Sequence, residues 1–135
     1  MMSRVSLLLL ATGVVVITAG CSESQPEPPA VCSSVKSLEA SVDELTAVDL
    51  EQGALAEVRD NLAQVQTDLG KVQDDAKDEY ATEIAAVGDA SASVSSSVNA
   101  ATTSPSAVAI TDVGTSIRAL GTSITSLVDA VKSTC

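Results

Sequence analysis

Aromatic and imidazole side chains are almost absent from this chain of 135 residues. It contains no Trp, Phe or His, and Tyr80 is its single aromatic residue. Small-ligand pockets are lined mainly by hydrophobic and aromatic side chains, and His is the side chain used most often in general acid–base catalysis. The sequence also lacks a Ser-His-Asp or Cys-His pattern and a glycine-rich loop that could cradle a phosphate. This composition argues against an enzyme, and we predict no catalytic residue.

Positive charge is scarce as well. Seven Lys and Arg residues stand against eighteen Asp and Glu, which gives a formal net charge of −11 at pH 7. Such a chain repels nucleic acid and anionic lipid headgroups, because both are negatively charged. We therefore expect no nucleic-acid partner and no electrostatic attachment to a lipid surface.

The most apolar segment lies at the N-terminus. After Arg4, residues 5–17 are apolar with few exceptions. This length is typical of the hydrophobic core of a secretory signal peptide and is too short to span a membrane comfortably. Three small residues at 18–20 then lead directly to Cys21. The pattern predicts a cleavable export signal over residues 1–20.

The stretch Thr18-Ala19-Gly20-Cys21 resembles the lipobox of bacterial lipoproteins, in which an aliphatic residue and two small residues precede an invariant cysteine. Ala19 and Gly20 match the small positions, whereas Thr18 departs from the aliphatic one. The resemblance implies a diacylglyceryl group on Cys21, whose acyl chains, such as palmitate, would hold the protein on the extracytoplasmic side of the cell membrane, or on the outer membrane of a Gram-negative host. Ordinary signal cleavage, which releases a soluble protein, and an uncleaved anchor are the alternatives.

The chain contains three cysteines. If Cys21 is acylated, Cys32 and Cys135 remain as a pair, and an exported protein folds in a compartment where disulfides persist. We therefore predict a Cys32–Cys135 disulfide, and the alternative is two unrelated free thiols. Closing a loop of about one hundred residues removes unfolded-state entropy worth about 4 to 5 kcal/mol in the chain-entropy model.

A proline-rich segment separates the first two cysteines. Residues 22–30, SESQPEPPA, combine three prolines with polar side chains, a composition that predicts an extended tether. At about 3 Å per residue it would hold the folded part about 30 Å from the anchor. We therefore expect a lipidated tether over 21–31 and a folded domain over 32–135.

The folded domain is predicted to be all-α. Apolar residues recur at alternating steps of three and four over 35–45, 55–76 and 110–131, which places them on one face of a helix. The middle stretch keeps heptad spacing, typical of a seam that faces another helix, and leaves Asp68 off the stripe. After residue 76 the pattern slips by one position and continues from Tyr80, with no Gly or Pro at the slip.

Capping signals predict where the helices begin and end. Asp49, with Gln52 three residues later, is typical of a capping box and predicts a second helix starting near Leu50, after a first helix that ends close by. Ser104 followed by proline predicts the start of the last helix, which would run over 105–133.

Two arrangements bring Cys32 and Cys135 to the same end. In the one we favour, the second helix runs unbroken for about 50 residues, and the first and last helices lie end to end along it as an antiparallel hairpin of three unequal helices. The alternative is a four-helix up-down-up-down bundle with a turn near Gly88 or residues 77–79. The lack of a strong turn signal favours the first.

The densest charge lies at residues 74–83, DDAKDEYATE, where carboxylates four apart would repel one another on a helix. Five of them are candidate cation ligands: Asp74, Asp75, Asp78, Glu79 and Glu83. Helical spacing does not wrap carboxylates around one ion as a loop does, so a solvated acidic face is favoured and no metal site is predicted.

Three further residues could mediate contacts. Tyr80 is a candidate interface residue, because tyrosine is enriched at interfaces, and the alternative is that it fills the core at the slip. Gly114 and Gly121, seven apart on the last helix, could permit the close approach of a neighbouring helix, and the alternative is that they occupy tolerant positions.

These patterns lead us to expect a non-enzymatic cell-envelope lipoprotein that acts as a protein-interaction or spacer module. Its partners would be the membrane, through the lipid, and an envelope protein, and no cofactor beyond the covalent lipid is expected. The alternative is a receptor or carrier for a cation or an apolar envelope ligand held between helices. Long heptad seams also make self-association possible. The domain loosely resembles small exported helical proteins of actinobacteria, a resemblance that implies no activity.

Overall fold

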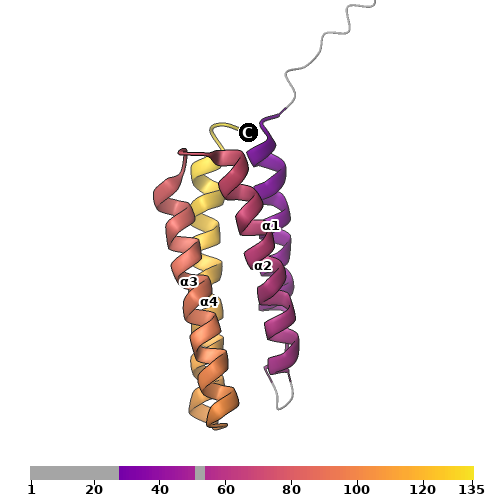
Figure 1. Ribbon diagram of the computed structural model, residues 1–135, viewed down its shortest axis with the longest axis vertical. Helices are drawn as coiled ribbons and strands as arrows, with labels where there is room; N and C mark the ends of the chain where they lie inside the picture. Colours follow the sequence, from indigo (N-terminus) through magenta and orange to yellow (C-terminus); the bar gives the residue numbers. More distant parts are fainter. Residues whose placement is uncertain (1–27, 51–53) are drawn as a thin grey trace, which may run out of the picture.

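Four helices form an up-down-up-down bundle in the computed structural model, which describes residues 28–50 and 54–135 (Figure 1). The helices are α1 (Ala30–Thr46), α2 (Leu55–Ala76), α3 (Ala81–Thr103) and α4 (Ala107–Val131). They pack in the cyclic order α1–α2–α3–α4, so that each helix contacts two neighbours. The described residues contain no strand, and the predicted all-α class is confirmed.

The core is built almost entirely from Leu, Ile and Val on the predicted faces. The heptad stripe of α2 is buried along its length: Val58, Leu62, Val65, Leu69, Val72 and Ala76. The largest fully buried side chains are leucines of the first and last helices, α1 and α4: Leu38, Leu45, Leu120 and Leu127. The three- and four-residue steps therefore identified the buried faces of α1, α2 and α4 correctly.

The structure corrects the expectation of one continuous second helix. α2 ends at Ala76 and α3 begins at Ala81, so the turn lies where the four-helix alternative had placed one, and the three-helix hairpin is not formed. Lys77 and Tyr80 reverse the chain with φ values of 54° and 60°. Non-glycine residues rarely adopt positive φ, and for that reason no ordinary turn signal marked this site. Gly88, the other proposed turn, lies inside α3.

The first two helices begin elsewhere than expected. α1 starts at Ala30, so it includes the last two residues of the predicted tether. α2 starts at Leu55 with Ala54 as its N-cap, which makes no side-chain capping hydrogen bond. The predicted cap at Asp49 is therefore not at a helix start, and its partner Gln52 lies outside the described residues.

The last helix is capped by a different serine from the one predicted. Ser106 is the N-cap of α4, and its Oγ accepts a hydrogen bond from the Ala109 backbone N–H at 3.0 Å. Ser104 and Pro105 lie in the turn between α3 and α4. A serine stands on each side of Pro105, and either could serve as an N-cap. Ser106, the second of them, is the one that caps α4.

Only one of the two spaced glycines permits a close approach. A Cβ atom at Gly114 would lie 3.2 Å from Leu50 Cδ1, whereas a Cβ at Gly121 would meet nothing within 4 Å. The connector after α1 therefore passes closely over α4 at Gly114. No helix in the described ranges is both long and apolar enough to cross a membrane.

Candidate functional site

A disulfide joins the two ends of the folded domain. Cys32 lies in the first turn of α1 and Cys135 follows α4, with their Sγ atoms 2.07 Å and their Cα atoms 5.8 Å apart. The predicted pair is confirmed at bonding distance. Figure 1 shows that this is also the end at which the chain enters α1. The third cysteine, Cys21, lies outside the described residues, as does the predicted signal segment 1–20.

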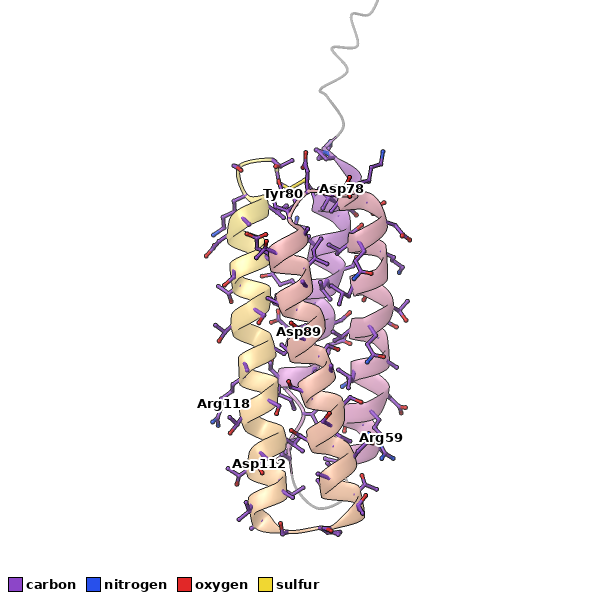
Figure 2. The ribbon with its side chains drawn as sticks, turned by 60° about the vertical axis from the view of Figure 1, so that its left-hand side comes forward. Arg59, Asp78, Tyr80, Asp89, Asp112 and Arg118 are labelled. Carbon is purple, nitrogen blue, oxygen red and sulfur yellow. A yellow bond between two sulfur atoms is a disulfide. The ribbon has the colours of Figure 1, made fainter. Side chains whose placement is uncertain are left out.

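Tyr80 closes the same end of the bundle. It is the N-cap of α3, its ring is half-buried against the core, and its hydroxyl shares a hydrogen bond with Thr134 Oγ1, next to Cys135 (Figure 2). These contacts favour the alternative reading of Tyr80 as a residue that fills the core where the apolar pattern slips. Its role at an interface stays a prediction.

The acidic residues near the α2–α3 turn do not gather around a common point. Within 28–50 and 54–135, no group of three or more Asp, Glu, His or Cys residues is placed to hold a metal ion. The five candidate ligands spread over the end of α2, the turn and the first turn of α3. Asp75 accepts a hydrogen bond from Ser34 Oγ of α1. Its role is therefore to link two helices.

The carboxylate of Asp68 is buried, which the sequence pattern did not predict. Asp68 is only 3% exposed, although the heptad pattern placed it off the buried stripe. It accepts hydrogen bonds from Ser41 Oγ, from Gln64 Nε2 at 3.1 Å and from Lys71 Nζ at 3.1 Å. Burial raises the pKa of Asp68. The hydrogen bonds from these three residues and the charge of Lys71 lower the pKa, and their combined effect is larger than that of burial. The pKa lies below its ordinary value as a result.

The two Ser–Asp contacts form a ladder between α1 and α2. Ser34 and Ser41 are seven residues apart on α1, and their acceptors Asp75 and Asp68 are seven apart on α2. On antiparallel helices the equal spacings let both pairs meet at once, and they do so in only one register of α1 against α2. A shift by one heptad would leave a buried serine or a carboxylate without its partner, at a cost of about 1 to 3 kcal/mol. Paired seven-residue spacings on neighbouring helices were the sequence signal for this ladder.

The opposite end of the bundle carries an apolar surface. A cavity of about 670 Å³ lies between the α1–α2 connector and the α3–α4 turn, with Leu50, Leu55, Pro105 and Ile110 in its wall and no charged side chain among its described lining residues. Val108, on the first turn of α4, is 71% exposed and is the only exposed large hydrophobic side chain in the described part of the chain. The two ends of the bundle are therefore chemically different.

The chain matches no protein-family model, no curated protein and no solved structure.

Proposed function

We propose that this protein is a non-enzymatic lipoprotein of the cell envelope, held to the membrane by a diacylglyceryl group on Cys21, and that it acts as a protein-interaction or spacer module. One observation carries the proposal. The chain enters the bundle at the disulfide end, whereas Val108 and the cavity, whose described lining residues carry no charge, lie at the other end. An anchor before α1 would therefore present the apolar end away from the membrane.

The distal end has the chemistry of a protein contact. The exposed Val108 and a cavity lined mainly by apolar residues, both at this end, are the observations that support a contact here. The rest of the molecule is strongly acidic, with a net charge of −11 over the whole chain, which disfavours nucleic acid as the partner. We propose an envelope protein that covers Val108, and a second copy of this chain is the other occupant to test.

Site-specific photo-crosslinking in the native host tests this function. A photoreactive residue at Val108 samples the distal end, and the matched control at Ala92 samples the exposed face of α3. The proposal predicts a discrete covalent adduct from position 108 and none from position 92. An adduct with the mass of two copies would identify self-association, and the absence of any adduct from position 108 would contradict an interaction role at this end.

The cavity also supports a second candidate, a carrier of an apolar envelope ligand. Its volume of about 670 Å³ falls in the range of small-molecule sites, about 300 to 1,000 Å³. A long-chain fatty alcohol should then raise the melting temperature further as its concentration increases, whereas a short-chain alcohol should not. Equal melting temperatures with both would contradict a carrier role.

A further inference from the structure

The packing divides the bundle into two helical hairpins, α1–α2 and α3–α4. Contacts are far more extensive within each hairpin than between them. Each hairpin also has its own internal polar contact, between Ser41 and Asp68 in the first and between Ser97 Oγ and Ser116 Oγ, 2.7 Å apart, in the second. The hairpins are therefore the tightly packed units of this fold.

Several cavities lie between the two hairpins. One of about 550 Å³ lies between α1 and α4 at the disulfide end, with Cys32 and Cys135 in its wall, and one of about 140 Å³ lies between α2 and α3, beside Leu62 and Val98. The distal cavity also has one wall from each hairpin. Because the hairpins also contact each other less extensively than the helices within them do, the seams between the hairpins hold less firmly than the seams within them.

All covalent links between the hairpins lie at one end. The turn from Lys77 to Tyr80 connects α2 to α3 at the end where α1 begins and α4 ends (Figure 1), and the Cys32–Cys135 bridge connects α1 to the end of α4. At the other end, the two connections each join helices of the same hairpin. The disulfide end therefore has the geometry of a hinge.

Few polar contacts hold α2 and α3 together at the distal end, the end opposite the disulfide. Arg59 Nη2 of α2 donates to Thr102 Oγ1 at 3.1 Å and to Asn99 Oδ1 at 3.4 Å, both on α3, and both contacts are exposed to solvent. Midway along α3, Ser91 is 2% exposed, and its Oγ has no hydrogen-bond partner among the described residues. Burial in the closed bundle costs this hydroxyl its hydration, which weakens the closed state.

We propose that the two hairpins form a clamp, hinged at the disulfide and the 77–80 turn, that opens transiently at the end where Leu55 lies opposite Ala101. Such an opening exposes the distal core while the disulfide and the 77–80 turn hold the hinge end together, as expected of a sub-global motion with a free energy below that of complete unfolding. This motion belongs to the folded domain itself and is independent of the anchor and of any partner.

Cysteine accessibility along α3 tests the clamp. Ala101, Val94 and Val87 are all fully buried and lie at increasing distance from the distal end. Each is replaced singly by Cys in the full chain carrying Cys21→Ser, with the Cys32–Cys135 bridge intact, and the rate of modification by a thiol reagent is measured under native conditions. A clamp predicts the order Ala101→Cys, then Val94→Cys, then Val87→Cys, with a spread of at least about tenfold.

Two other outcomes would overturn the proposal. Equal rates at all three positions, with the denaturant dependence of global unfolding, would mean that the core opens only when the whole domain unfolds. A fast Ala101→Cys beside equally slow Val94→Cys and Val87→Cys would mean simple fraying of the α3 end. If Val94→Cys fails to fold, Ser91→Cys takes its place, because Ser and Cys differ little in size.

Discussion

Ser41 Oγ of α1 donates a hydrogen bond to the buried carboxylate of Asp68 on α2. One heptad away, Ser34 makes the same contact with Asp75. Between α1 and α2 the other buried side chains are aliphatic, so these pairs are the side-chain contacts that distinguish one α1–α2 register from the next. Buried polar residues in other helical assemblies fix register in the same way.

Removing the Ser41 hydroxyl should destabilise the fold. Ser41→Ala leaves Asp68 buried with one hydrogen bond fewer, which we expect to lower the free energy of unfolding by about 1 to 3 kcal/mol. Urea denaturation measures this change. Ser93→Ala is the control, because Ser93 is exposed and bonds only the Asp89 carbonyl of its own helix, and it should change the stability by less than about 0.5 kcal/mol. Equal effects of the two substitutions would contradict a stabilising role of the ladder.

The same carboxylate should make the fold sensitive to acid. The pKa of Asp68 is lower in the folded protein than its ordinary value, so the unfolded chain takes up the proton at a higher pH than the folded one. The stabilisation is therefore complete above about pH 4 and is lost as the pH falls through the lowered pKa. Asp68→Asn should flatten this loss in urea denaturation between neutral and acid pH, whereas Asp89→Asn, on the exposed face of α3, should leave it intact. A decline that is identical in both variants would refute the assignment.

Ser91 should be a position where the fold gains stability. Its buried Oγ has no partner within the described residues, so Ser91→Ala removes an unsatisfied hydroxyl and should raise the unfolding free energy by about 1 kcal/mol. Ser97→Ala is the matched control on the same helix, because it takes away the partner of Ser116 and should lower the melting temperature. The reasoning fails if both substitutions lower it equally.

The α2–α3 turn should carry backbone strain at Lys77. This residue has φ 54° and ψ −116°, a conformation that glycine adopts without a steric penalty. Lys77→Gly should therefore stabilise the bundle by about 1 kcal/mol, whereas Lys77→Ala removes the same side chain and keeps the strain. Chemical denaturation of the two variants compares them, and a glycine variant no more stable than the alanine variant would argue against a strained turn.

The turn also explains what the sequence could and could not predict. Helical faces were predictable because burial depends on spacing, and the disulfide followed from counting cysteines. The break after Ala76 could be placed only as one of two alternatives, because Lys77 and Tyr80 occupy positions where Gly or Asn would normally signal positive φ. The one-residue slip in the apolar pattern was its only trace.

Burial of Asp68 was missed for a related reason. It precedes Leu69 on α2, at the edge of the heptad stripe, where a charged residue usually faces solvent. Only the neighbouring helix, which brings Ser41 to it, makes burial favourable. The contact depends on which two helices pair, and a single helical pattern does not contain that information.

The proposed protein consists of a lipid anchor at Cys21 and a domain closed by the Cys32–Cys135 bridge. The most direct test is the intact mass of the protein extracted with detergent from its native host, measured before and after reduction and alkylation. We predict a chain that begins at Cys21 and carries a diacylglyceryl group, with Cys32 and Cys135 alkylated only after reduction. An unlipidated mass would contradict the anchor, and alkylation of both cysteines without reduction would contradict the bridge.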